Sequence, residues 1–168
     1  MDNRRSDRRQ EPKEFDEKVI RISRVSKKTK GGNQISFTAL VVIGDKKGRV
    51  GVALGKAKDV LSAIKKAVRK AKKQLLNVPL VDNRTIPHLV NLKLGAAKLL
   101  LKPAPEGTGV IAGGSVRAVL ELAGVRDVVA KTLGTNNKLG NVNATFAALK
   151  LMKVTVDKKT SLGQGTTK

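Results

Sequence analysis

The stretch KKTKGGNQISFTALVV, Lys27 to Val42, decides the first half of the fold. Its lysines stand beside a double glycine, and an apolar segment follows. Every second residue from Ile35 to Ile43 is apolar, and this period of two predicts a strand that buries one face on a core. Because glycine tolerates the backbone angles of tight turns, the double glycine predicts a turn into that strand from an earlier one.

Two further strands and a helix are predicted around this segment. Apolar residues between Val19 and Val25 indicate the earlier strand, and RVGVALG, Arg49 to Gly55, indicates a later one. The later strand carries only glycine and alanine on one face, which would let a helix or an RNA backbone come close. Asp59 is predicted to cap the helix that follows. The apolar stripe predicted for that helix is Val60, Leu61, Ile64, Ala67, Val68, Ala71 and Leu75.

The second half begins after NVPLVDNRTIP, Asn77 to Pro87, where two prolines break the periodicity and predict a domain boundary. A hairpin is predicted from His88 to Leu101, turning at Gly95. The helix in SVRAVLELAG is predicted to be capped by Ser115 and stopped by Gly124. A strand over 125–133 and a last helix over 142–152 complete the predicted elements.

Charge indicates the kind of partner. The net charge is +22, from 35 lysines and arginines against 13 aspartates and glutamates. The first 17 residues are nearly neutral, whereas Lys18 to Leu75 holds 17 basic residues against Asp45 and Asp59 alone. Such a field attracts polyanions and repels copies of itself, so a phosphate backbone is the predicted partner.

The aromatic content narrows this prediction. Phe15, Phe37 and Phe146 are the three aromatic residues, and there is no Tyr or Trp. Proteins that bind single strands stack bases on such side chains, so contact with the backbone and shape of folded RNA is favoured. A membrane surface is disfavoured because the apolar anchor opposite a basic helical face is missing. The basic residues of the predicted helix are compatible either with a solvated face or with RNA contact.

The chain is poor in residues for catalysis or metal binding. Cysteine is absent, His88 is the single histidine and is interpreted as an ordinary strand-edge residue, and the acids outside the first 17 residues are scattered. GVALGKA, Gly51 to Ala57, lacks the spacing and the hydroxyl of a phosphate-binding P-loop. The glycines between Gly107 and Gly114 either cradle a phosphate or form a tight packing loop, and both interpretations stay open. We therefore predict no enzyme, no metal, no cofactor and no small-molecule substrate.

Two long blocks carry a family resemblance. RVSKKTKGGNQISFTALVVIGDKKGRVGVALGKAKDV begins at Arg24, and PAPEGTGVIAGGSVRAVLELAGVRDVVAKTLG begins at Pro103. In this order they resemble the universal fifth protein family of the small ribosomal subunit, in its bacterial form. Asn33 and Gln34 stand where that family usually has a basic residue.

The resemblance implies an α+β fold. It implies an N-terminal double-stranded-RNA-binding-like domain, with a three-strand antiparallel sheet and one helix, and then a small α/β domain. The predicted division is a disordered arm over 1–14, the first domain over 15–77, a linker over 78–86, the second domain over 87–154 and a flexible tail over 155–168.

The resemblance also implies a function. Members of the family bind small-subunit ribosomal RNA near the mRNA entry path, support assembly, and contact the fourth and eighth small-subunit proteins, the fourth in connection with translational accuracy. We therefore predict a structural protein of a cytoplasmic, bacterial-type ribosome, with no membrane partner. The alternatives are a free double-stranded-RNA-binding regulator and, on fold analogy alone, a phosphotransferase.

Two sets of residues carry these predictions. The predicted RNA-binding residues are Arg24, Lys27, Lys28, Lys30, Gly31, Gly32, Asn33, Gln34, Ser36, Arg49, Lys56 and Lys58. By resemblance, 27–36 matches a loop whose changes confer spectinomycin resistance. The residues that the resemblance assigns to the contact with the fourth protein are Glu106, Gly107, Thr108, Gly109, Gly113, Gly114 and Arg117.

Overall fold

The computed structural model describes residues 14–152, and it has two four-stranded sheets and three helices there. Residues 1–13 of the predicted arm and all of the predicted tail lie outside the described residues. The first half contains β1 (Asp16–Thr29), β2 (Gly32–Gly44), β3 (Arg49–Ala57), α1 (Val60–Lys72) and β4 (Leu75–Asn77). The second half contains β5 (Val90–Leu94), β6 (Ala97–Pro103), β7 (Val110–Ile111), α2 (Gly114–Ala123), β8 (Val128–Thr132) and α3 (Lys138–Leu151). The predicted α+β class is confirmed.

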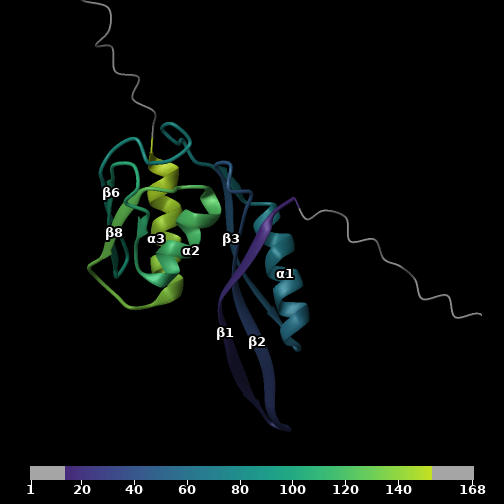
Figure 1. The fold of residues 1–168 in the computed structure, drawn as a ribbon. Coiled ribbons are helices and arrows are strands. Elements are labelled where there is room, and N and C mark those ends of the chain that lie inside the picture. The colour runs from purple at the N-terminus through teal and green to yellow at the C-terminus, as the bar shows by residue number, and fades with distance from the viewer. Residues whose placement is uncertain (1–13, 153–168) are drawn as a thin grey trace, which may run out of the picture.

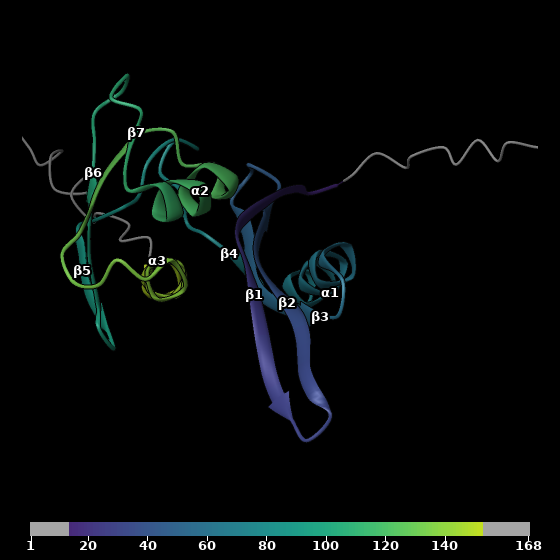
Figure 2. The same cartoon turned by 90° about the horizontal axis from the view of Figure 1, so that it is seen from below.

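The elements form four layers. Figure 2 shows the sheet of the second half, then α2 and α3, then the sheet of the first half, and finally α1. The first sheet has the order β1-β2-β3-β4 and is antiparallel throughout. The second has the order β5-β6-β8-β7, in which β7 and β8 are parallel and are joined through α2. The two layers of helices thus cover opposite faces of the first sheet.

Close packing of α1 on β3 explains the small residues in both elements. The buried residues of α1 are Ala63, Ala67 and Ala71. A Cβ on Gly51 would lie 2.6 Å from the carbonyl oxygen of Ala71, and one on Gly55 would lie 2.6 Å from the amide nitrogen of Ala67. Of the two partners predicted for the bare face of this strand, the structure places the helix there.

The apolar stripe predicted for α1 was too wide. Asp59 caps the helix as predicted, and its carboxylate accepts a hydrogen bond from the amide of Ser62. However, the sheet covers mainly the alanines, and the side chain of Leu61 is 67% exposed. The helix also ends at Lys72, so Leu75 belongs to β4 and not to the stripe.

From Ala39 to Ile43, both faces of β2 are buried, whereas the alternation predicted one. Ala39, Val41 and Ile43 pack toward α1 in one cluster. Leu40 and Val42 lie in a second cluster together with residues of α2, α3 and the second sheet. The two halves of the chain therefore share a continuous core.

Hydrogen bonds reinforce this joint between the halves. The amide of Lys46 donates to the carbonyl of Leu122 at 3.1 Å, and that of Gly48 donates to Ala123 at 2.9 Å. Lys18 of β1 forms an ion pair with Glu121 of α2 at 3.0 Å. Burial would raise the pKa of Glu121, but hydrogen bonds from Arg117 and Lys18 lower it below its usual range.

Residues 78–86, the predicted linker, are packed against this core. Val78 and Ile86 are buried in the shared cluster, and the amide of Val78 donates to the carbonyl of Gly48 at 2.7 Å. Between them, Asp82 and Asn83 have positive φ angles of 52° and 53°, which fits a tight turn. This connection fixes the two halves against each other.

The ends of α2 were predicted only in part. Gly124 stops the helix with a left-handed φ of 92°, as predicted. The N-cap is Gly113 and no side chain caps the helix, so Ser115 lies inside the first turn and the prediction of its capping role was wrong.

Candidate nucleic-acid interface

The β1–β2 hairpin projects from the rest of the molecule as a finger (Figure 1). Its turn has two residues, Lys30 and Gly31, between the paired Thr29 and Gly32. The hydroxyl of Thr29 donates to the carbonyl of Gly32 at 2.7 Å, which closes the turn. Gly32 has a φ of 127°, which side chains rarely adopt, whereas Gly31 has no positive φ.

Open space surrounds both glycines. A Cβ on Gly31 or Gly32 would meet no atom within 4 Å. The turn at Gly32 therefore needs glycine for its backbone angle, but the fold gives no steric reason for Gly31. A bare backbone at this position leaves room for a ligand to approach closely.

The strand register sends the finger's polar side chains to two faces. Lys28 lies opposite Asn33, and Lys27 lies opposite Gln34. Directly paired residues project from the same face, and successive residues from opposite faces. Lys28, Asn33 and Arg24 therefore share the face that carries α1 lower down the sheet. The other face, toward the second half of the chain, has Lys27, Gln34 and Ser36.

The lysines of the finger are free to meet an anion. Lys27, Lys28 and Lys30 are exposed, and none of the ion pairs within residues 14–152 includes them. With charge on both faces and at the tip, the geometry fits insertion between phosphates better than a flat contact. Like charges gathered at an unsupported tip add nothing to folding, so they indicate a polyanionic ligand.

The three residues expected to support the finger lie in different places. Lys56 is opposite Thr38 at the base of the finger, on the same face as Lys27. Lys58 is exposed in the turn before α1. Arg49 pairs with Asn77 at the far end of the sheet, so the structure does not bring it to the finger.

Arg49 has a structural role instead. Its guanidinium donates to Asp45 at 2.7 Å, forms an ion pair with Glu14 at 3.2 Å, and lies 5.0 Å from the centre of the Phe15 ring. Burial would raise the pKa of Asp45, but hydrogen bonds from the Arg49 side chain and from the amides of Lys47 and Arg49 lower it below its ordinary value. This arrangement holds the turn between β2 and β3.

Sequence reasoning missed a groove beside the finger. Arg21, Ser23 and Val25 of β1 face the start of α3 across a hollow of about 200 Å³. These are alternate residues of β1, so they share a face with Lys27, and the bulge between Val19 and Arg21 turns that face toward the second half of the chain. The two-residue spacing of Arg21, Ser23, Val25 and Lys27 in the sequence could have predicted that these side chains share one face. The remaining lining residues of the groove are Thr38, Leu40, Leu54, Asn137 and Leu139.

The second predicted surface divides into two parts at the ends of β7. At one end, Glu106, Gly107, Thr108 and Gly109 form a loop. At the other end, Gly113, Gly114 and Arg117 belong to the start of α2. The seven residues therefore lie in two segments on either side of β7.

The loop is built around Asp127, whose side chain is only 5% exposed. The carboxylate accepts a hydrogen bond from the amide of Gly109 at 3.0 Å, and this lowers the pKa of Asp127 together with nearby Arg84. Arg84 also forms an ion pair with Glu106. The amides of this loop thus already bind the carboxylate of Asp127, which favours the packing-loop interpretation over a phosphate cradle.

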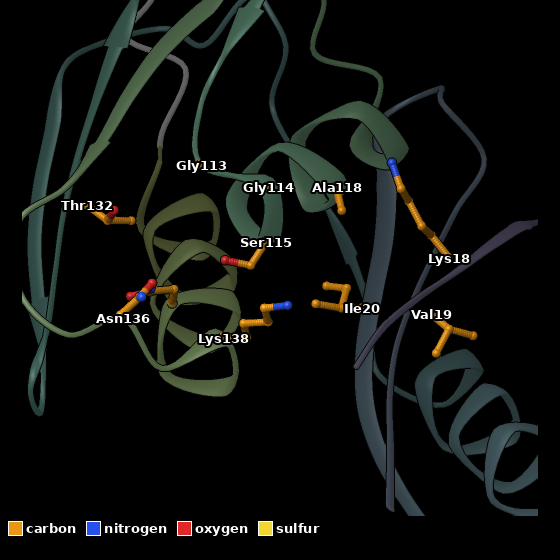
Figure 3. A pocket seen from close by; sticks show the side chains of 11 residues that line it. Lys18, Val19, Ile20, Gly113, Gly114, Ser115, Ala118, Thr132, Asn136 and Lys138 are labelled. Atoms are coloured by element: carbon orange, nitrogen blue, oxygen red, sulfur yellow. The ribbon is translucent and has the colours of Figure 1, made fainter. Parts of the chain in front are cut away.

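The start of α2 borders a pocket of about 290 Å³ between the halves of the chain. In Figure 3, Lys138 points across this pocket toward Ile20, whereas Lys18 points away toward α2. Lys18 is held there by Glu121. Arg117 also pairs with Glu121, at 2.7 Å.

The described residues hold no group of three or more histidines, cysteines or acids that could bind a metal ion. His88 precedes β5 and its Nδ1 lies 3.1 Å from the carbonyl of Leu89. Gly51 and Gly55 are covered by α1, so GVALGKA forms no phosphate loop. None of the helices within 14–152 has the length and apolar character needed to span a bilayer.

Comparison with known proteins decides the family. Residues 15–79 match the model "Ribosomal protein S5, N-terminal domain", and residues 92–159 match "Ribosomal protein S5, C-terminal domain". The chain belongs to the ribosomal protein S5 family. This is a family of structural proteins of the translation machinery and not of enzymes, as the sequence predicted.

Relatives that match over most of their length support the same assignment. The chain is 50% identical over 155 residues to "Small ribosomal subunit protein uS5c" of Rhodomonas salina, covering 91% of this chain and 92% of the relative. It is 53% identical over 150 residues to "Small ribosomal subunit protein uS5" of Acaryochloris marina, with coverages of 88% and 85%. The uS5 protein of Thermosynechococcus vestitus is 51% identical over 155 residues, with coverages of 91% and 89%.

Proposed function

We propose that this S5-family chain is a structural component of the small ribosomal subunit that binds ribosomal RNA chiefly through its finger. The observation that carries the proposal is the exposed cluster of Lys27, Lys28 and Lys30 around an open glycine turn, which forms no ion pair with residues 14–152. The names of the relatives support the assignment to the small subunit, because each is called a small ribosomal subunit protein.

The finer parts of the proposal concern position and neighbours. The finger, with Arg24, Asn33, Gln34, Ser36, Lys56 and Lys58, binds small-subunit RNA near the mRNA entry path and supports assembly. The loop from Glu106 to Gly109 and the start of α2 contact the fourth small-subunit protein and contribute through it to translational accuracy. The eighth protein is a further neighbour.

The shared core supports this role mechanically. Because the two halves pack on one cluster, an RNA contact at the finger and a protein contact at the loop are held in a fixed relation. A rigid two-sided body can set the distance between an RNA helix and a protein neighbour. The proposed location is the ribosome of a bacterial cytoplasm or a plastid, since relatives of both kinds match.

Sedimentation of a lysate from cells that express the chain tests this proposal. Nearly all copies should move with small subunits at physiological salt and leave them as the salt concentration rises, because released counterions favour dissociation. A free double-stranded-RNA-binding regulator would stay mostly at the top of the gradient. That result would overturn the proposal.

A further inference from the structure

The outer side of α1 carries a groove that residues 14–152 leave uncovered. Its floor is formed by Ile64 and Val68, which are half-buried, and its walls by Lys65, Arg69 and Lys72, with Glu17 of β1 at one edge. The volume is about 350 Å³. Leu61 lies one helical turn before Ile64 and extends the apolar floor along the helix.

This groove explains why the apolar stripe of α1 is wider than the sheet requires. The alanines Ala63, Ala67 and Ala71 already fill the contact with β3. Leu61, Ile64 and Val68 form a second apolar row at helical spacing beside them, in which Ile64 and Val68 pack only partly against the same core and Leu61 is 67% exposed. A stripe that exceeds what the fold buries marks a surface on which another apolar face can pack.

The binding partner of this groove must offer both an apolar surface for the floor and negative charge for the basic walls. Nucleic-acid phosphates would neutralise Lys65, Arg69 and Lys72, but they would gain nothing from the apolar floor. The groove has no aromatic side chain on which a base could stack. An amphipathic helix with acidic residues beside its apolar row satisfies both the floor and the walls.

The chain itself does not supply such a segment. Residues 1–13 hold five basic and three acidic residues and almost no apolar ones, and residues 153–168 hold four basic residues against Asp157. A second copy of the chain is repelled by the net charge of +22. We infer that the groove binds an acidic amphipathic helix of a different protein, a contact independent of RNA binding by the finger.

A peptide titration on the full chain tests this inference. The probe is a synthetic 18-residue helical peptide, with leucine at every third or fourth position and glutamate at most others. The control is a peptide of the same composition in shuffled order. The ordered peptide should bind about tenfold more tightly, because only its leucines form a row that fits the floor. Equal affinities would mean simple charge attraction and would overturn the inference.

Matched variants then locate the site. Lys65→Ala with Arg69→Ala should weaken binding of the ordered peptide about tenfold. Lys66→Ala with Lys70→Ala removes the same charge from another face of α1 and should change binding less than about twofold. Leu61→Ser should weaken binding, whereas Leu89→Ser, another exposed leucine, should not. Equal effects within either pair would contradict the inference.

The same variants separate protein from RNA as the partner. A duplex RNA should bind the Lys65/Arg69 and Lys66/Lys70 variants equally well. If only the first pair were needed for duplex RNA, and the ordered peptide showed no preference for it, the groove would be an RNA contact and the inference would fail. Thermal unfolding of each variant confirms that it is folded, and the comparison of the two peptides on the unaltered protein needs no variant.

Discussion

Replacing Leu120 with alanine should weaken both halves of the molecule, because its side chain belongs to the core that they share. Leu120 is fully buried in α2, in one cluster with Leu40 and Val42 of β2. Loss of a buried leucine side chain costs about 2–5 kcal/mol in the free energy of unfolding, from transfer and cavity together. Domains of this kind have about 5–15 kcal/mol in total, so the variant should fold but lose a large share of its stability.

Native-state hydrogen exchange is the appropriate assay, since the chain has no Trp or Tyr for intrinsic fluorescence. A loss of 2 kcal/mol speeds exchange of globally protected amides about 30-fold. We expect this acceleration in β2 and β3 as well as in β6 and β8. Leu61→Ala, at an exposed leucine, is the control and should change little. Faster exchange in β6 and β8 with β2 unchanged would show that the halves unfold separately and do not depend on a shared core.

Two further perturbations test other parts of the structure. Gly55→Ala should lower the free energy of unfolding by about 1–3 kcal/mol in thermal or urea unfolding, because the new Cβ would lie 2.6 Å from the amide nitrogen of Ala67. Gly31→Ala, in open space, should be nearly neutral, and a neutral Gly55→Ala would mean that α1 is free to shift. Asp45→Asn should lower stability at neutral pH and reduce the loss that acid causes. The folded-state pKa of Asp45 lies below its ordinary 3.8, so its contribution is present above that value and disappears as the pH falls through the folded-state pKa. Urea unfolding at neutral and strongly acidic pH measures the difference, and an unchanged pH dependence in the variant would count against this assignment.

Local signals in the sequence predicted the ends of several elements. Asp59 and Gly124 act through their own side chain or backbone angle, so the neighbouring residues suffice to predict them. The prediction for Ser115 failed because a serine caps a helix only at the N-cap position. In α2 that position is Gly113, two residues earlier. The strands β4 and β7 have three and two residues, too few for any periodicity to show.

The sequence of β2 does indicate burial on its second face, but the alternation of apolar residues from Ile35 to Ile43 drew attention to one face only. The run ALVVI, Ala39 to Ile43, is continuously apolar, as expected for a strand covered on both sides. Which element covers the second face depends on the packing of α2, which the sequence does not display. In α1 the sequence predicted more burial than the structure has. Leu61 fits the helical period of apolar residues, but the sheet does not cover it.

The candidate site was predicted by residue type and not by arrangement. Three lysines beside two glycines indicated a phosphate-binding turn, but their division between faces follows from the pairing of Lys28 with Asn33 and Lys27 with Gln34. Arg49 is close to the other basic residues in sequence, yet the length of β2 places it at the far end of the sheet. Such separations depend on strand length and register, which residue types alone do not fix.

Binding to small-subunit particles depleted of this protein tests whether the finger is the main RNA-binding element. The full chain is compared with Lys27→Ala, Lys28→Ala and Lys30→Ala combined, and with a control in which Lys66 and Lys70 of α1 and Lys73, which caps its end, are replaced by alanine. We expect the finger variant to stay folded, to bind at least about tenfold more weakly, and to lose about one unit of salt-dependence slope for each phosphate contact removed. If the finger variant bound as well as the control variant, with the same salt dependence, the finger would not be the RNA-binding element.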